Sequence, residues 1–118
     1  MLSDRARLAL FDMRDNIRLC RQFIEGCTLE TFKQNRMIFY AVTRALEIVS
    51  EASRRLPASL RERHPHLPWR AIMDVGNVYR HAYDNVAEEY VWRTVTQSLD
   101  PLLAVVVEEI EREGGGLG

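Results

Sequence analysis

The chain has 118 residues and a mass of 13.7 kDa, which is room for one compact domain. Its 47% hydrophobic and 28% charged residues make it neither polar enough for disorder nor apolar enough for a membrane protein. The formal charge of −1 excludes bulk attraction to nucleic acid or to an anionic membrane, so any nucleic-acid site has to be local. No apolar stretch approaches the ~20 residues of a spanning helix and no signal-peptide region is present, so we expect a cytoplasmic protein.

Two long amphipathic helices are predicted in the first half of the chain. Apolar residues recur there at steps of three and four, and Gly26 ends the first helix. Thr28 can cap a second helix, which keeps this spacing until Pro57 stops it. The apolar positions are Ala6, Leu10, Met13, Ile17, Cys20 and Ile24 in the first helix, and Ile38, Val42, Ala45, Val49, Ala52 and Leu56 in the second.

The second half of the chain begins with a proline-rich connector and continues with two further helices. Residues 57–68 sustain no long periodic pattern, which predicts a connector with one short helical turn. Pro68 suits the first position of a third helix, which Asp84 and Asn85 end, and Asp100-Pro101 marks a kink or a restart in the fourth. The apolar positions are Ile72, Val75, Tyr79 and Ala82 in the third helix, and Trp92, Val95, Leu99, Leu102, Val106 and Ile110 in the fourth.

These elements predict an all-α protein built as an antiparallel four-helix bundle, because no segment alternates with the period of a strand. We expect a single domain over residues 1–113 and a loose glycine-rich tail over 114–118. The apolar stripes are broad enough to make a symmetric homodimer plausible. Cys20 and Cys27 would lie ~10 Å apart on a helix, beyond disulfide reach, so we expect Cys20 in the core and Cys27 as a free thiol in a turn.

The predicted third helix carries a polar face that a bundle does not need. Its members follow one another at steps of four, three and four, with Arg80 beside them and Tyr83 just beyond; they are Arg70, Asp74, Asn77 and His81. A histidine beside an arginine suits metal-free RNA cleavage, in which a base activates a ribose 2′-hydroxyl and a cation stabilises the phosphorus transition state. Residue types alone favour a solvated surface group, and Arg70 with Asp74 could be a surface ion pair.

Other groups of polar residues indicate no metal, cofactor or triad chemistry. The glycine cluster at the C-terminus precedes no helix that could receive a phosphate. His64 and His66 lack companions for a metal site and are interpreted as loop residues. The acidic helix end is interpreted as solvated; it consists of Glu108, Glu109, Glu111 and Glu113.

The chain resembles the HepT-like branch of the HEPN superfamily over nearly its whole length. The combination of blocks carries the resemblance, because no block is specific by itself. The blocks are Leu46-Glu47-Ile48-Val49-Ser50-Glu51-Ala52, Pro68-Trp69-Arg70-Ala71-Ile72, Gly76-Asn77, His81-Ala82-Tyr83, Val91-Trp92-Arg93-Thr94-Val95 and Pro101-Leu102-Leu103.

The resemblance implies a dimeric all-α bundle with a metal-independent ribonuclease site, where two copies of an Arg-x4-His-x-Tyr motif meet. It further implies a toxin whose antitoxin is a minimal nucleotidyltransferase that can adenylylate the motif tyrosine. His81 matches the motif histidine and Tyr83 the tyrosine.

The motif arginine does not match, because Gly76 occupies its position. Arg80 lies one helical turn, or ~5.4 Å, farther along and is a candidate to replace it. Alternatively, catalysis has been lost while the dimer and the partner surface persist. Gly76 could also serve packing, by letting two third helices approach closely at a dimer centre.

Two functional hypotheses follow. In the first, the chain is a ribonuclease toxin that uses His81 as general base or acid and Arg80 as the phosphate-binding cation, while Asn77 orients His81. Tyr83 and Arg70 are its substrate contacts, and Tyr83 is also a possible modification site. In the second, a catalytically inactive helical dimer is the binding partner or substrate of a nucleotidyltransferase.

Overall fold

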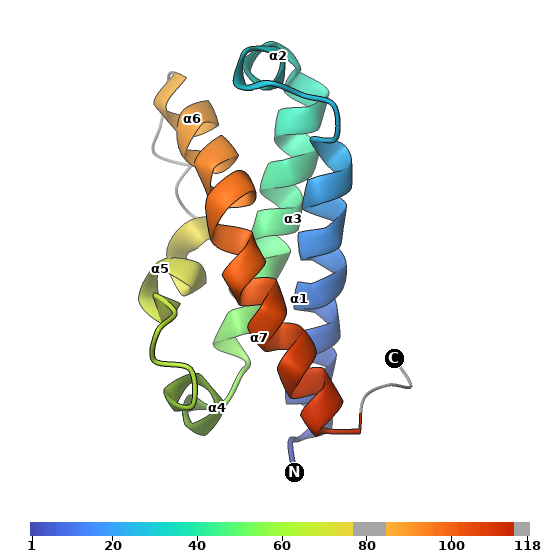
Figure 1. Cartoon of the computed structure of the whole chain (residues 1–118), viewed down its shortest axis with the longest axis vertical. Helices are drawn as coiled ribbons and strands as arrows, with labels where there is room; N and C mark the ends of the chain where they lie inside the picture. Colours follow the sequence, from blue (N-terminus) through green and yellow to red (C-terminus); the bar gives the residue numbers. More distant parts are fainter. Residues whose placement is uncertain (77–84, 115–118) are drawn as a thin grey trace.

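The computed structural model is a bundle of helices (Figure 1). It describes residues 1–76 and 85–114, with the backbone alone for residues 85 and 86. Neither range contains a strand, which confirms the all-α class. The elements are α1 (Asp4–Phe23), α2 (Leu29–Gln34), α3 (Arg36–Arg54), α4 (Ala58–Glu62), α5 (Trp69–Asp74), α6 (Asn85–Arg93), a π-helical turn (Thr94–Ser98) and α7 (Leu99–Arg112).

The long helices α1, α3 and α7 lie side by side, with α5 against α3 on the opposite side from α1 (Figure 1). Helices α1 and α3 are antiparallel. Asp12 in the middle of α1 accepts a hydrogen bond of 2.9 Å from Arg55 at the end of α3, whereas Cys20 near the end of α1 donates at 3.9 Å to the carbonyl of Val42 in the first half of α3. Helix α7 is also antiparallel to α1. Its last turn reaches back to the N-terminus, where the Leu2 amide donates to Glu113 at 3.0 Å.

The core consists mainly of the predicted apolar stripes of α1, α3 and α7, whose central members are almost completely buried, together with Phe32 of α2 and Leu60 of α4. In the stripe predicted for the third helix, Val75 is buried and Ile72 partly buried, while Tyr79 and Ala82 lie outside the described residues. Both cysteines are free, and burial raises the pKa of the Cys20 thiol to about 12, which agrees with its assignment to the core. The most deeply buried side chains include Leu10, Met13, Ile17, Phe32, Val42, Leu46, Val49, Leu60, Leu102 and Val106.

The second helix was predicted to be continuous, and this was wrong, because the structure has two helices in its place, α2 and α3. Thr28 caps as predicted, because its hydroxyl accepts from the Thr31 amide at 3.2 Å and Thr31 returns the bond. The helix then ends at Asn35, which is extended and caps α3 by accepting from the Ile38 amide at 3.0 Å. Asparagine side chains compete in this way with the helical hydrogen-bond pattern.

The irregularity predicted at Asp100-Pro101 lies one turn earlier. Pro101 has no amide hydrogen to donate to the carbonyl four residues before it, and its ring crowds that carbonyl. The chain accommodates this with the π-helical turn at Thr94–Ser98, in which the Leu99 amide reaches back five residues to the Thr94 carbonyl. The short helical turn predicted in the connector is confirmed as α4.

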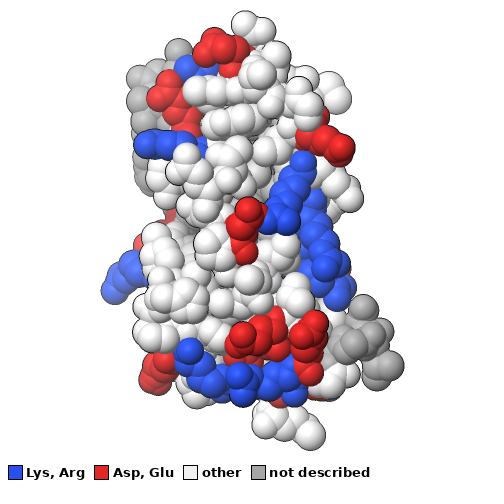
Figure 2. Space-filling view, viewed as in Figure 1, with Lys and Arg blue, Asp and Glu red and all other residues white. Residues whose placement is uncertain are grey.

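A buried carboxylate joins this connector to α7, which corrects two predictions. Glu109 is fully buried and His64 is only 6% exposed, although both were expected in solvent. The Glu109 carboxylate contacts Arg63 at 2.6 Å and His64 Nε2 at 2.6 Å. Buried charges occur where partners satisfy them, and here those partners lie on the connector. Figure 2 shows the surrounding acidic and basic side chains gathered at this end of the molecule, where α7 ends.

The pKa of Glu109 reflects a balance between burial and its partners. Burial by itself would raise this pKa, but the hydrogen bonds from Arg63 and then His64 outweigh it and hold the pKa below its usual value. A carboxyl group whose pKa is lower in the folded than in the unfolded protein stabilises the fold when the pH is above its unfolded-state pKa, near 4.5. This stabilisation is lost as the pH falls through its folded-state pKa.

We therefore expect Glu109→Gln to lower the free energy of unfolding at pH 7 by about 2–4 kcal/mol, because it leaves Arg63 without its counter-charge. The effect stays below that of a fully buried pair since the Arg63 side chain is 39% exposed. The difference from wild type should shrink in acid, as measured by urea unfolding at pH 7 and below pH 4. Glu108→Gln, on an exposed neighbour, is the control; equal effects of the two variants would contradict the assignment.

None of the helices in the described part of the chain is both long and apolar enough to cross a membrane.

Candidate functional site

The polar face predicted on the third helix falls mostly outside the described residues. This applies to Asn77, Arg80, His81 and Tyr83, whose roles stay predictions. Arg70 is described and lies exposed on α5. Asp74 is exposed on the same helix, and within the described ranges no ion pair joins it to Arg70, so the surface pair considered from the sequence does not form.

Polar contacts to one carbonyl fasten the end of α5 to α3. The Met73 carbonyl accepts hydrogen bonds from the Ser50 hydroxyl and from the Arg54 guanidinium, both at 2.5 Å. Ser50 is 1% exposed and lies on α3 between apolar core positions. Helix α5 itself has no completely buried side chain, so these bonds, the turn that follows and the partly buried Trp69 and Ile72, which pack against the core, together position it on α3.

The turn that follows brings Gly76 into contact with the α3 backbone. A Cβ at this position would lie 3.1 Å from the Glu47 Cα and 3.2 Å from the Ser50 Cβ. These distances are shorter than van der Waals contact, and the nearest atom belongs to the main chain of a long helix, which cannot move aside cheaply. Glycine therefore allows the chain to cross α3 at this point.

This contact disfavours the motif arginine at position 76. The Cβ of any side chain there would lie closer to α3 than ordinary contact allows, so the neighbouring atoms would have to shift. The sequence suggested a packing role for Gly76 between the third helices of two subunits. The described contact is with α3 of the same chain, and a contact between subunits remains a prediction.

The residues after the motif segment are also anchored to α3. At the start of α6, the carboxylate of Glu88 receives a hydrogen bond of 2.9 Å from Arg36. Its neighbour Glu89 receives one of 2.8 Å from Lys33 of α2. Glu88 is only 7% exposed, and its second oxygen is buried without a hydrogen-bond partner. Arg36 is therefore held at the point where α2, α3 and α6 meet (Figure 1).

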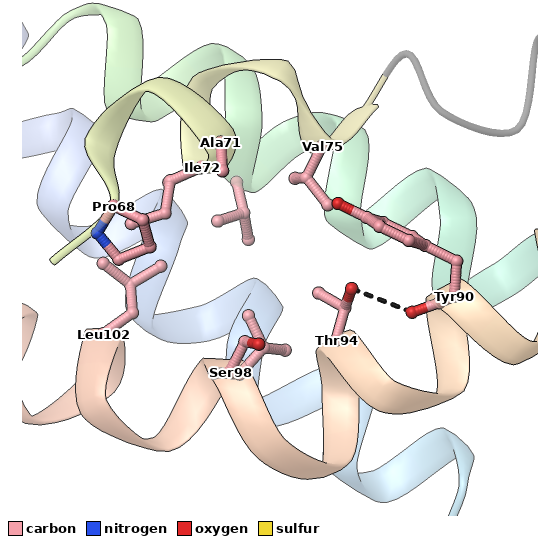
Figure 3. Close-up of a pocket in the computed structure, with 10 residues that line it drawn as sticks. Pro68, Ala71, Ile72, Val75, Tyr90, Thr94, Ser98 and Leu102 are labelled. Atoms are coloured by element: carbon pink, nitrogen blue, oxygen red, sulfur yellow. Dashed lines mark hydrogen bonds between the residues drawn. The ribbon is translucent and has the colours of Figure 1, made fainter.

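A small apolar cavity of about 70 Å³ separates α5 from the helices opposite. Figure 3 shows the Tyr90 ring extending across it toward Val75, with Thr94 and Ser98 on the π-helical side. The Thr94 hydroxyl donates to the Tyr90 carbonyl at 2.9 Å, as hydroxyl side chains do at helix irregularities. Since its hydroxyl groups are few and its walls mostly aliphatic, the cavity lacks the convergent polar groups of a catalytic pocket.

One group of described residues has the geometry of a metal site. The ligand atoms of His64, Glu108 and Glu109 lie within 4.8 Å of one another. The guanidinium of Arg63 already contacts both oxygens of Glu109, and Arg112 is 3.7 Å from one of them. A divalent cation would have to displace Arg63, so we interpret the group as a structural ion-pair network.

Sequence reasoning missed this network, although one signal for it exists. Glu109 lies three residues after Val106 and seven after Leu102, in register with the buried stripe of α7. A carboxylate in register with a core stripe indicates a buried charge with a partner elsewhere in the chain. Nothing in the sequence identified His64 and Arg63 as those partners.

The comparisons with known proteins agree with this architecture. Residues 13–109 match the family described as "Ribonuclease HepT-like". A protein of Thermococcus cleftensis named "Probable ribonuclease HepT" is 33% identical over 93 residues, which cover 79% of this chain and 84% of that protein. "Putative RNase MJ1380" of Methanocaldococcus jannaschii is 32% identical over 90 residues, covering 76% of this chain and 83% of its own length. No solved structure matches the chain.

The class of protein is therefore an all-helical bundle of the HEPN type. Within that class, the chain belongs to the HepT-like ribonuclease family, as its sequence resemblance predicted. The matched region includes the positions of His81 and Tyr83.

We expect Gly76→Ala to destabilise the protein by about 1–3 kcal/mol, because the added methyl group overpacks against α3. In an open helical position the same change would instead stabilise the fold by up to ~1 kcal/mol. A thermal unfolding measurement shows directly whether Gly76→Ala raises or lowers the stability of the protein. Gly76→Arg should be still less stable, whereas Asp74→Arg on exposed α5 should change stability little; a stabilising Gly76→Ala would show that the contact with α3 is loose.

Proposed function

We propose that this chain is the metal-independent endoribonuclease toxin of a HepT-like toxin–antitoxin pair, acting on RNA in the cytoplasm as a homodimer. The observation that carries the proposal is the family match over residues 13–109, which includes the segment with the motif histidine and tyrosine. The names of the T. cleftensis and M. jannaschii relatives support ribonuclease activity. The dimer brings two such segments to one composite site.

His81 acts in this proposal as the general base. Its imidazole removes the proton of a ribose 2′-hydroxyl, the resulting oxygen attacks the adjacent phosphorus, and the bond to the 5′-oxygen breaks. The leaving oxygen takes a proton from the imidazolium of the other copy of His81, which is protonated when the reaction begins. The products are a 2′,3′-cyclic phosphate and a 5′-hydroxyl, and Asn77 orients the histidine one turn away.

Arg80 supplies the cation that the motif lacks at position 76. A guanidinium beside the phosphate neutralises the charge that develops on its oxygens during attack. Arg80 is proposed as the replacement because a side chain at position 76 would crowd α3. Arg70 on exposed α5 is a further substrate contact.

The partner in this proposal is a minimal nucleotidyltransferase that acts as the antitoxin. Its modification target is the Tyr83 hydroxyl, which would attack the α-phosphate of ATP and release pyrophosphate. The AMP group adds negative charge beside the catalytic histidine, which opposes binding of an RNA phosphate.

A second candidate function is a catalytically inactive dimer that binds the nucleotidyltransferase. The buried Gly76 favours it specifically, because this chain lacks the motif arginine and packs a different residue type there. In that case the bundle and the partner surface persist without RNA cleavage.

We expect the purified protein to cleave RNA in the presence of EDTA and to leave 2′,3′-cyclic phosphate ends, and His81→Ala to lower the rate by at least 10²-fold, the usual contribution of a general base. Product ends can be identified by mass spectrometry of a cleaved tRNA pool. His66→Ala, on an exposed connector residue, is the matched control. Cleavage that survives His81→Ala would remove this residue from the mechanism.

The same assay with Arg80→Ala tests the relocated cation, and growth arrest on expression should disappear with it. If Arg80→Ala is as toxic as wild type while Arg70→Ala is not, the cation comes from α5 instead.

We expect co-expression with the minimal nucleotidyltransferase proposed as the antitoxin to yield a stable complex. With ATP, we expect the mass of the chain to increase by one AMP on Tyr83. Intact-mass measurement and Tyr83→Phe locate the modification. A protein that cleaves no RNA but forms this complex would support the inactive-dimer alternative. A protein that forms no complex and gains no AMP would exclude both the antitoxin partnership and that alternative.

A further inference from the structure

A solvent-facing aromatic side chain lies between two arginines on α3. Tyr40 is 63% exposed, although large aromatic side chains usually bury most of their surface. Arg36 and Arg44 lie four residues before and after it, so the three side chains follow one face of the helix at steps of ~6 Å. The Arg36 and Arg44 side chains are 57% and 67% exposed.

The Tyr40 ring is the outer end of an aromatic series that starts in the core. The rings of Trp92 and Phe32 are 5.4 Å apart, and Phe32 and Phe39 are 6.0 Å apart. Phe39 meets Tyr40 edge to face, also at 6.0 Å. The exposed ring therefore stands on a packed base, and little side-chain freedom remains to be lost when it binds a ligand.

The guanidinium of Arg36 lies over this ring. It is 4.9 Å from the centre of the Phe39 ring and 5.3 Å from that of Tyr40, and its Nη1 donates to Glu88 at 2.9 Å. Arg36 is therefore held on one side of the Tyr40 ring by an ion pair and by contacts with two aromatic rings.

We propose that Arg36, Tyr40 and Arg44 form a platform on which α3 binds unpaired RNA, with a base stacked on Tyr40 and the flanking phosphates near the two arginines. This inference rests on the proposed function, since it defines the substrate as single-stranded at this point. Unpaired bases expose the flat faces that aromatic and guanidinium groups stack on, whereas paired bases in an RNA helix do not.

Charge favours RNA over a second protein as the ligand. The centres of protein interfaces are depleted of charged residues, but this tyrosine has an arginine on each side. Each arginine also has a carboxylate partner on the protein, Arg36 with Glu88 at 2.9 Å and Arg44 with Glu47 at 3.6 Å, which an RNA phosphate would have to share. An RNA strand alternates an apolar base with a negative phosphate, which complements the order of arginine, tyrosine and arginine. The surface also lies beside the start of α6, which directly follows the segment that carries His81 in the sequence.

The test measures binding separately from cleavage. A short unpaired oligoribonucleotide with 2′-O-methyl groups lacks the nucleophile, so fluorescence anisotropy reports affinity alone. Tyr40→Ala should weaken binding by roughly 5- to 150-fold, the usual loss for one stacked base. Tyr40→Phe should retain affinity, and Tyr40→Leu should not, since it keeps apolar bulk without the aromatic face.

Arginine variants test the electrostatic part. Arg44→Ala should weaken binding and reduce the slope of log affinity against log salt by about 1, as expected for a lost phosphate contact. Arg18→Ala changes the net charge equally on exposed α1 and should leave the slope unchanged. Thermal unfolding should be near wild type for all these variants, because the substituted side chains are exposed.

Several results would overturn the platform. They are wild-type affinity in Tyr40→Ala, an equal weakening by Tyr40→Ala of binding to a duplex of the same sequence, and absence of RNA binding by the wild type. A molecular mass of Tyr40→Ala in light scattering that differs from that of the wild type would also overturn it, because it would assign this face to contact between two copies of the chain. Binding that depends on Tyr40 without any cleavage of ordinary RNA would support the platform and reject the nuclease. Cleavage with unchanged affinity in Tyr40→Ala would do the reverse.

Discussion

The close contact between Gly76 and α3 determines how the connection between the two halves of the bundle is arranged. A Cβ at position 76 would lie 3.1 Å from the α3 backbone, which is tighter than ordinary contact, so the arginine of the family motif would require α3 or the turn to shift. In this protein, packing within the bundle therefore favours glycine at position 76, where the family motif has arginine.

Polar contacts hold the part of the connection that precedes Gly76, together with Leu60 and Leu67, whose side chains lie in the core. At one end His64 contacts buried Glu109, and its carbonyl accepts the indole N–H of Trp69 at 3.0 Å. At the other end Ser50 binds the Met73 carbonyl. Helix α5 between them buries no side chain completely and covers a cavity. Segments with few buried apolar contacts open at lower cost than the core.

Helix α3 performs three tasks with three of its faces. One face contributes Val42, Leu46 and Val49 to the core, and the next receives α5 through Ser50. The third is open to solvent and carries Tyr40 with its arginines. The periodic burial of one face leaves the other positions free of packing constraints, so a single helix can support α5 and also carry the surface that we propose for RNA binding. Membership of the HepT-like ribonuclease family and the glycine at the motif position are thus compatible within one structure.

The sequence by itself determined the all-α class, the buried stripes, the cap at Thr28 and the family, because each depends on the spacing of residues close together in the chain. It did not determine the break at Asn35 or the position of the π-helical turn, where local side chains and Pro101 compete with helical hydrogen bonding. Only the tertiary structure decided that Glu109 is buried and that Gly76 touches α3. Both depend on partners distant in the chain, since Arg63 precedes Glu109 by 46 residues, and folding alone brings such groups into contact.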